Sequence, residues 1–328
     1  MIRFLARLVA TLFGVGLAVA AALTWMVAQI DQPGPLAEAK TLIIPKHSGV
    51  FDIAGQLARQ GVVSSEHLFL IASQIAGQGA ALKAGEYVFP VGISMRAAVE
   101  LLQLGKTVVH RLTVPEGFTT VQVLELLEGA EGLYGDIDPK PGEGVLLPET
   151  YHYSWGDNRQ TVVDRMRAGM KKAIDELWTR RAASLPFKTK DEAVILASIV
   201  ERETGVAGER PRVAAVFINR LRHGMKLQSD PTVTYGLSNG RGSIDRPLSK
   251  ADLATRHPYN TYVIDGLPPS PIANPGLASL QAVLHPADSD DLFFVADGSG
   301  GHAFAKTLVE HNRNVANWRK VEKGAAAD

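Results

Sequence analysis

Apolar residues form one long run near the amino terminus and then return in short, periodic stretches. From residue 8 to residue 30 the sequence holds no charged side chain, and a helix of this length crosses a hydrocarbon core of about 30 Å. Arg3 and Arg7 precede the run and Asp31 follows it, so the positive-inside rule assigns the amino terminus to the cytoplasm. We therefore expect a cytoplasmic tail at 1–7 and a single transmembrane helix at 8–30.

A cleavable signal peptide is the alternative interpretation of this run, because the small residues at 18–22 supply a cleavage site. The apolar stretch nevertheless continues through Leu23 and Val27, and Trp25 suits a membrane interface. These residues favour a retained anchor, with everything after Asp31 on the far side of the membrane.

After the apolar run comes a short irregular segment, followed by stretches with the periodicity of strands and of helices. Residues 31–39 contain two prolines and no regular pattern, so we interpret them as a tether. The following pattern predicts strands at 41–45, 86–90 and 107–114, and helices at 48–57, 64–75 and 94–105. Together these pieces predict a small α+β domain at 40–111, for which a spacer without a ligand is the alternative.

The pattern of the remaining residues predicts a larger mixed α/β domain at 112–320, followed by a tail at 321–328. Its predicted helices are a short one capped by Thr119 or Thr120, an amphipathic one at 161–181, a buried one at 189–205, and one at 213–221. An exposed connection is predicted at 135–144. Glycine, proline and asparagine become frequent after residue 224, so this third should be rich in loops that carry binding groups.

The helix at 189–205 is apolar almost all round. Thr189 and Glu192 have the spacing of a capping box, which predicts the start of the helix. Because apolar residues cover most of its circumference, we expect a buried helix rather than a surface one.

Glu201 stands near the end of this helix and is the main candidate for acid–base chemistry. A partly buried carboxyl group can hold its proton near neutral pH and act as a general acid. Glu203 lies roughly 200° further around the axis, so it does not share the same face. The structural alternative for Glu201 is an ion pair with Arg202, Arg210 or Arg220.

Composition narrows the possible chemistry. The 328 residues carry a formal net charge of zero, which argues against nucleic acid as the main partner. There are no cysteines, so disulfides and thiolate metal sites are excluded. The nine histidines lack a metal-ligand spacing, so no metal site is expected.

Eight ordered motifs surround these features. They are PEGFT (115–119), EGVLLPETYHY (143–153), ASIVERETG (197–205), VFINRL (216–221), LQSDPTVTYGL (227–237), HPYNTY (257–262), GLPPSPIANPG (266–276) and FFVADGSGGHAF (293–304). Together they resemble the YceG-like (MltG) family of endolytic murein transglycosylases. The resemblance runs from the apolar amino-terminal stretch to Trp318, which is nearly the whole chain.

The resemblance implies a single-pass protein of the bacterial inner membrane, with a periplasmic LysM-like subdomain followed by a catalytic domain. It implies cleavage of the β-1,4 bond between N-acetylmuramic acid and N-acetylglucosamine in nascent glycan strands of peptidoglycan, which leaves 1,6-anhydromuramoyl ends and stops elongation. It also implies that Glu201 is the catalytic acid. Peptidoglycan synthases are candidate partners.

One carboxyl group can suffice for this reaction. A retaining hydrolase needs a second carboxylate about 5–5.5 Å away, and an inverting one needs a base roughly 6.5–9.5 Å away. A lytic transglycosylase instead uses the 6-hydroxyl of the muramic acid, which is already tethered to the reacting ring. The acid first protonates the bridging oxygen and then accepts the hydroxyl proton, so no cofactor is required.

Several polar and aromatic residues are candidates for holding the sugar. They are Gln228, Ser229, Asp230, Thr232 and Tyr235 in one motif, Tyr259, Asn260 and Tyr262 in another, and Glu149 as a second acidic group. Amides and hydroxyls bind sugar hydroxyls, and tyrosine rings cover pyranose faces. The alternatives are a turn at Asp230, a loop held by Asn260, tyrosines in the core, and a surface carboxylate at Glu149.

Two other interpretations remain open. The run GSGGH at 298–302 lacks a phosphate-binding fingerprint, so we expect a tight turn between strands. For the whole chain, the rivals of the lytic enzyme are a membrane-anchored muramidase of the same bond specificity and a non-catalytic, glycan-binding scaffold for synthases.

Overall fold

The computed structural model describes residues 2–77 and 81–325, which divide into two compact units. Unit 1 comprises Met1–His110, Glu131–Tyr134 and His152–Asp157, and unit 2 comprises Arg111–Ala130, Gly135–Tyr151 and Asn158–Asp328. Helices and short antiparallel sheets occur together, so the predicted mixed α and β class is confirmed. Met1 and the tail residues 326–328 lie outside the described residues.

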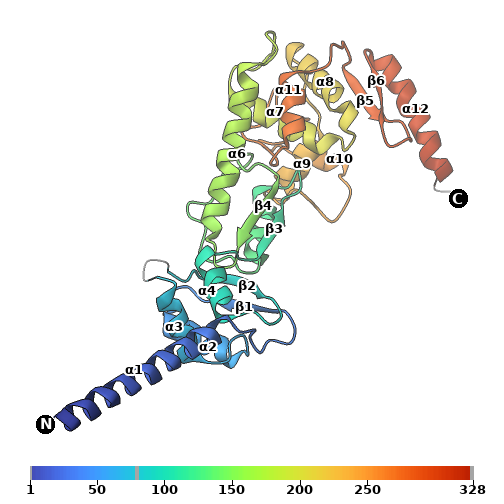
Figure 1. Cartoon of the computed structure of the whole chain (residues 1–328). Coiled ribbons are helices and arrows are strands. Elements are labelled where there is room, and N and C mark those ends of the chain that lie inside the picture. Colours follow the sequence, from blue (N-terminus) through green and yellow to red (C-terminus); the bar gives the residue numbers. More distant parts are fainter. Residues whose placement is uncertain (1, 78–80, 326–328) are drawn as a thin grey trace. The chain divides into compact units, whose positions relative to one another are not determined.

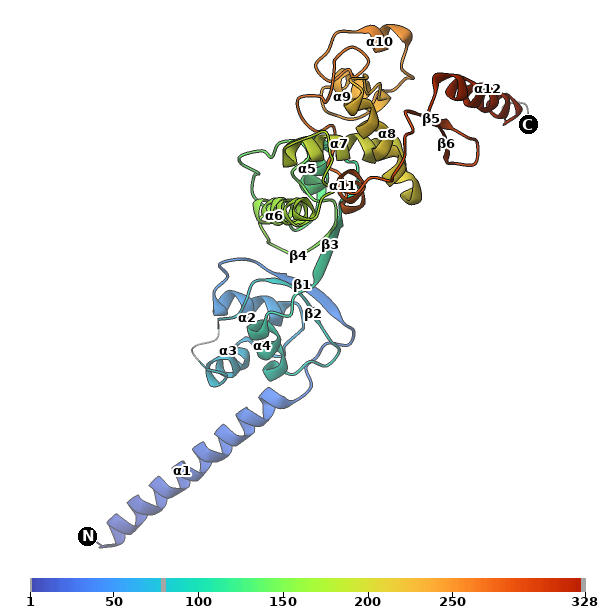
Figure 2. The ribbon, with the colours of Figure 1, turned by 90° about the horizontal axis from the view of Figure 1, so that it is seen from above.

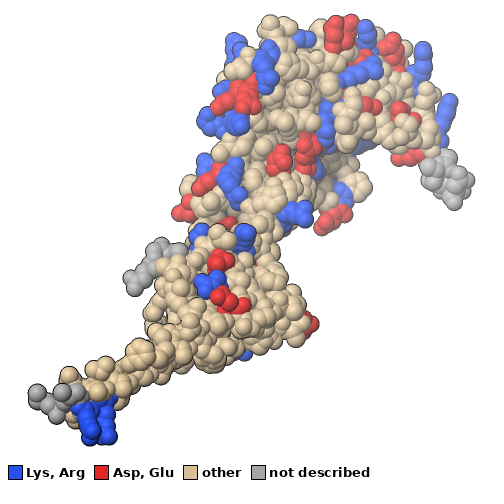
Figure 3. Space-filling model, in the orientation of Figure 1, with Lys and Arg blue, Asp and Glu red and all other residues tan. Residues whose placement is uncertain are grey.

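The long helix α1 (Ile2–Asp31) projects from the body of unit 1 (Figure 1). Among the described residues it is the one helix long and apolar enough to cross a membrane. The visible face of α1 is uncharged along most of its length in Figure 3, and the sequence places the basic residues of α1, Arg3 and Arg7, near its amino-terminal end. The last turn of α1 is packed against unit 1, unlike the exposed turns before it. Ile30 is 0% exposed, and Asp31 pairs with Arg96 at 2.5 Å.

The segment after α1 packs on unit 1. The Gly34 N–H donates to the Gly92 carbonyl at 3.2 Å, and the Gly92 N–H donates to the Leu36 carbonyl at 2.9 Å. Leu36 is buried beside Ile30 in the same apolar cluster. Residues 32–39 therefore lack regular secondary structure, as expected, but they hold α1 against the unit instead of separating the two.

The body of unit 1 is a two-stranded antiparallel sheet with three helices (Figure 2). Strand β1 (Lys40–Ile44) pairs with β2 (Gly85–Phe89), with Lys40 opposite Phe89 and Ile44 opposite Gly85. The helices are α2 (Val50–Arg59), α3 (Glu66–Ile75) and α4 (Met95–Leu104). Ser65 and Ser94 cap α3 and α4 through their hydroxyl groups.

A second two-stranded sheet joins β3 (Val109–Thr113) and β4 (Thr150–Ser154). The division between the two units passes through both strands. A third sheet lies in unit 2, where β5 (Phe293–Ala296) pairs antiparallel with β6 (His302–Ala305).

The helices of unit 2 include the predicted ones and several short ones. They are α5 (Thr120–Gly129), α6 (Arg159–Thr179), α7 (Lys190–Glu203), the 3-10 turn η1 (Ala207–Glu209), α8 (Arg210–Arg222), α9 (Asp230–Leu237), α10 (Lys250–Ala254), α11 (Leu277–Leu284) and α12 (Leu308–Ala325). The three short helices α9 to α11 lie within the region expected to be rich in loops. Helix α12 continues into the stretch interpreted as a carboxyl-terminal tail.

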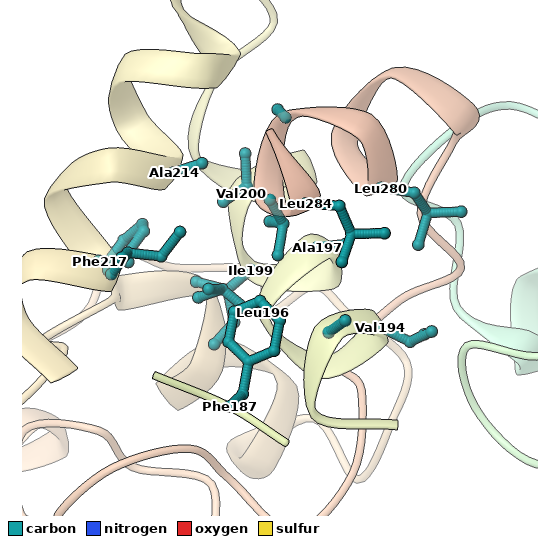
Figure 4. Close-up of a cluster of buried hydrophobic side chains, with 14 of the residues drawn as sticks. Phe187, Val194, Leu196, Ala197, Ile199, Val200, Ala214, Phe217, Leu280 and Leu284 are labelled. Carbon is teal, nitrogen blue, oxygen red and sulfur yellow. The ribbon is translucent and has the colours of Figure 1, made fainter. Parts of the chain in front are cut away.

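Helix α7 is the centre of the core of unit 2. Thr189 Oγ1 accepts the Glu192 N–H at 3.2 Å, and the Glu192 carboxylate accepts the Thr189 N–H at 2.9 Å, so the predicted capping box is confirmed. Figure 4 shows apolar side chains of α7 meeting those of α8 and α11. Burial of each such aliphatic side chain stabilises the fold by about 1.5–3 kcal/mol. This packing fixes α7 and leaves its carboxyl-terminal turn to carry polar groups.

Candidate active site

Glu201 lies in the last turn of α7 and is held by two donors. Its side chain is 4% exposed, and Arg210 Nη2 donates to Glu201 Oε1 at 3.2 Å. The backbone N–H of Gly276, before α11, donates to Glu201 Oε2 at 2.8 Å. In both hydrogen bonds the Glu201 carboxyl group is the acceptor. The ion pair with Arg210 is the structural alternative that the sequence leaves open.

Glu116, in the PEGFT motif, shares the same guanidinium. Its Oε2 lies 3.3 Å from Arg210 Nη2, and its side chain is 42% exposed. Burial and the negative charge of Glu201 raise the pKa of Glu116, while Arg210 opposes that shift. A Cβ at Gly276 would overlap the Glu116 carboxylate, so glycine is needed there for the close approach. Glu201 is thus part of a closed cluster of two carboxylates and one arginine.

Glu203, the last residue of α7, has a different environment. The Ser229 hydroxyl donates to Glu203 Oε1 at 2.5 Å, and Ser229 is buried. Burial raises the pKa of Glu203 to about 7; the Ser229 hydrogen bond opposes the rise, nearby Asp230 adds to it, and His302 and Arg220 oppose it. Glu203 therefore holds its proton to a higher pH than an ordinary carboxyl group does.

The loop before α9 supplies the groups around Glu203. Gln228 adopts φ +48°, an uncommon conformation for a residue other than glycine. Ser229 is the N-cap of α9, yet its hydroxyl serves Glu203 instead of the helix. Thr232 Oγ1 donates to the Ser229 carbonyl at 2.6 Å, which fixes the loop. The Tyr262 hydroxyl donates to Asp230 Oδ1 at 2.6 Å at the edge of this cluster.

The sequence comparisons agree with this arrangement of motifs. The YceG-like family profile matches residues 42–317. The chain belongs to the YceG-like family. It is 32% identical over 311 residues to the endolytic murein transglycosylase of Bacillus subtilis (strain 168), with 84% of each chain covered.

Two further relatives support the same family. The endolytic murein transglycosylase of Streptococcus pneumoniae serotype 2 (strain D39) is 28% identical over 325 residues, which cover 84% of this chain and 58% of that protein. A crystal structure of a YceG-like protein from Listeria monocytogenes is 29% identical and matches with a TM-score of 0.51, covering 84% of this chain and 99% of the other.

Several expected sugar ligands of this YceG-like chain lie elsewhere in unit 2. The Tyr235 hydroxyl donates to Glu143 Oε2 at 3.1 Å, and the Tyr259 hydroxyl lies 2.5 Å from Ser270 Oγ. The centroids of the two rings lie 4.9 Å apart with the ring planes tilted by 57°, and both rings pack against the core. Burial raises the pKa of Glu143. These tyrosines therefore have structural partners.

Asn260 and Glu149 also have environments that differ from the Glu203 cluster. The Asn260 amide donates to the carbonyls of Leu253 and Thr255, and its oxygen accepts the Tyr262 N–H, so the side chain holds its own loop. Glu149 is exposed, and its charge acts on Glu116. The structure thus brings Ser229, Asp230 and Tyr262 together with Glu203 and leaves Asn260 and Glu149 apart.

The sequence alone did not single out Glu203, because Glu203 lies on the opposite side of α7 from Glu201. The sequence did hold a signal for burial of Glu203, since a helix that is apolar all round is covered by protein on every face. A carboxyl group at the end of such a helix is desolvated on either side. Within residues 2–77 and 81–325, no group of three or more acidic or histidine side chains is arranged as a metal site.

Proposed function

We propose that this YceG-like chain is an endolytic murein transglycosylase. It cleaves the β-1,4 bond between N-acetylmuramic acid and N-acetylglucosamine of nascent glycan strands and leaves 1,6-anhydromuramoyl ends. The names of the relatives support the activity, and the observation that carries the chemistry is a carboxyl group with a pKa of about 7 beside polar loop residues.

In this proposal Glu203 is the general acid. The Ser229 hydroxyl occupies Glu203 Oε1, which leaves Oε2 to carry the proton. Glu203 protonates the bridging oxygen as the bond to the anomeric carbon breaks, and the 6-hydroxyl of the same muramic acid closes on that carbon. A second carboxylate nucleophile is not needed, because the substrate supplies its own.

Glu201 is the rival for this role, because the family resemblance points to the motif that holds both residues. Glu201 Oε1 accepts from Arg210 and Glu201 Oε2 accepts from the Gly276 N–H, so both oxygens are engaged inside the protein. We therefore assign Glu201 to holding Arg210 and the loop before α11.

Gln228, Asp230 and Tyr262 are the proposed sugar ligands, since they lie on the loop or edge that faces Glu203. Ser229 and Thr232 orient the acid and its loop. We assign no sugar contact to Tyr235, Tyr259 and Asn260, whose polar groups bond to other parts of the protein, or to Glu149, which lies apart from Glu203.

The proposal includes the location of the chain. Helix α1 would cross the bacterial inner membrane once, with Arg3 and Arg7 in the cytoplasm and both units in the periplasm. The order β1, α2, α3, β2 in unit 1 supports a LysM-like subdomain. Peptidoglycan synthases, which make the nascent strands, are the proposed protein partners.

A pair of isosteric variants tests the assignment. We expect Glu203→Gln to lose at least about 100-fold in kcat, because the general acid is removed, and Glu201→Gln to remain active if it folds. Mass spectrometry of digested glycan strands measures anhydromuramoyl ends, and circular dichroism checks the fold of each variant.

The outcomes separate the alternatives. Full activity of Glu203→Gln with loss in a folded Glu201→Gln would return the acid to Glu201. Reducing muramic acid ends would identify a muramidase instead. If the wild-type chain cleaved no form of glycan, the scaffold function would replace the enzyme.

A further inference from the structure

A second hydrogen-bonded pair of titratable side chains joins the β5–β6 hairpin to the turn η1. His302, the first residue of β6, places its Nδ1 2.7 Å from Glu209 Oε2. The backbone N–H of His302 donates to the other oxygen, Glu209 Oε1, at 2.9 Å. One carboxylate therefore holds both the backbone and the imidazole ring of His302.

The GSGGH run explains how this contact forms. It is the predicted turn between strands, and the Asp297 N–H donates to the Gly301 carbonyl at 3.0 Å to close it. A Cβ at Gly301 would lie 2.7 Å from Glu209 Oε1, so any larger residue would push the carboxylate away. A residue larger than glycine at position 301 would therefore displace the Glu209 carboxylate from its contact with His302.

Helix α8 fixes the hairpin that carries His302. Asn219 Nδ2 donates to the Asp291 carbonyl at 3.1 Å, and Arg220 Nε donates to the Leu292 carbonyl at 2.7 Å. The ring of Phe294 meets the rings of Phe217 and His302 edge to face, with centroid distances of 5.8 and 5.3 Å. The imidazole is thus held from its backbone, its Nδ1 and one ring face.

The free atom of this imidazole is Nε2. It makes no hydrogen bond to any residue that the structure describes, and the side chain of His302 is 17% exposed. A carboxylate at Nδ1 selects the tautomer with the proton on Nδ1 and leaves the Nε2 lone pair free. His302 also lies close enough to Glu203 for its charge to act on that carboxyl group.

We propose that His302 is a second proton-transfer residue of the active site, oriented by Glu209. The inference rests on the proposed transglycosylase function. Glu203 gives its proton to the bridging oxygen as the bond from that oxygen to the anomeric carbon breaks. The 6-hydroxyl oxygen bonds to that carbon, and its proton passes to His302 Nε2. The imidazolium then returns this proton to the Glu203 carboxylate, which restores both groups.

Assigning proton donation to Glu203 and proton acceptance to His302 agrees with the environment of Glu203. Oε1 is occupied by the Ser229 hydroxyl, so a single-carboxyl scheme would require Oε2 to deliver one proton and collect another at two places on the sugar. An imidazole with a free Nε2 removes that demand, since each group acts at one position.

His302→Asn is the sharpest test, because the asparagine amide can still donate to Glu209 while Nε2 is lost. With the full chain in detergent and uncrosslinked glycan strands, we expect kcat to fall about 100-fold and KM to stay within about twofold. His285→Asn, which changes an exposed histidine at the end of α11, is the matched control and should keep wild-type kcat.

His302→Ala provides a second test that does not depend on the asparagine variant folding well. Added imidazole should restore part of its activity and leave Glu203→Gln unchanged. A folded His302→Asn enzyme with wild-type kcat, or an alanine variant that imidazole does not rescue, would overturn the role of His302. Either result with an active wild type leaves the proposed function standing, whereas an inactive wild type removes the function itself.

Discussion

Glu201 and Glu203 lie two positions apart on one helix and still acquire different chemistry. Glu201 meets a guanidinium and a backbone N–H, which stabilise the carboxylate. Glu203 meets a hydroxyl group and is desolvated near Asp230, so burial raises its pKa to about 7. The two carboxyl groups therefore differ in the number and charge of the donors that they meet.

The raised pKa of Glu203 predicts a pH dependence of stability. Its ordinary value is 4.5 and its folded value is about 7, so the folded state binds this proton more tightly than the unfolded state. The stabilisation, about 3 kcal/mol for a rise from 4.5 to about 7, is fully present below about pH 4.5 and is lost as the pH rises through about 7. Urea unfolding of wild type and Glu203→Gln across this range measures it.

The difference between the two proteins is the informative quantity. Burial also raises the pKa values of Glu116 and Glu143, so both proteins should lose stability with rising pH. Only the wild type should show the additional loss from Glu203. Parallel curves for the two proteins would mean that Glu203 is not desolvated as described.

Helices with a capping motif or a clear apolar periodicity were predictable from the sequence, and the shortest helices were not. The capping box at Thr189 and the apolar periodicity of α6 come from residues close in sequence, and both were found where expected. Helices α9 and α10 are short and begin at Asp230 and Lys250 in a region rich in glycine and proline. Their stability comes from tertiary packing, which a single sequence does not display.

The candidate site was predictable only to the level of its motifs. The resemblance located the helix and the loop before α9, but the choice between the two glutamates depends on contacts made across the fold. The groups that act on the two glutamates are remote in sequence from α7; they are the Gly276 N–H, Ser229 and His302. Local patterns hold no information on which of them meets which carboxyl group.

The segment at 32–39 offers a test of packing that is independent of the active site. A Cβ at Gly34 would overlap the Ile93 carbonyl and lie 2.9 Å from the Val62 carbonyl. Both are backbone atoms that cannot move aside cheaply, so Gly34→Ala should destabilise unit 1 by about 1–3 kcal/mol. Hydrogen exchange in α3 and α4 measures the change in this unit.

Gly129→Ala is the control for that substitution, because nothing lies within 4 Å of a Cβ at Gly129. It should leave exchange in unit 1 unchanged. If Gly34→Ala behaved like this control, residues 32–39 would be a free tether after all.

The anchor and unit 1 form one continuous piece of structure. Ile30 belongs to both α1 and the core of unit 1, and Asp31 pairs with Arg96 of α4. In the proposed membrane-spanning arrangement the lipid-facing part of α1 ends before Ile30, which is buried in protein. About 20 residues between Arg7 and Ala28 suffice to span a bilayer. Unit 1 should therefore sit directly at the membrane surface without a flexible linker.

Two truncations test this coupling. A soluble chain that begins at Ala28 keeps Ile30 and the Asp31–Arg96 pair, whereas one that begins at Gln32 loses both. Removal of a fully buried isoleucine leaves a cavity and should cost about 2–4 kcal/mol. Hydrogen exchange in α3 and α4, which contact α1, should accelerate in the shorter chain. Ile30→Ala in the longer chain should reproduce most of that loss, and equal protection in all three proteins would contradict the coupling.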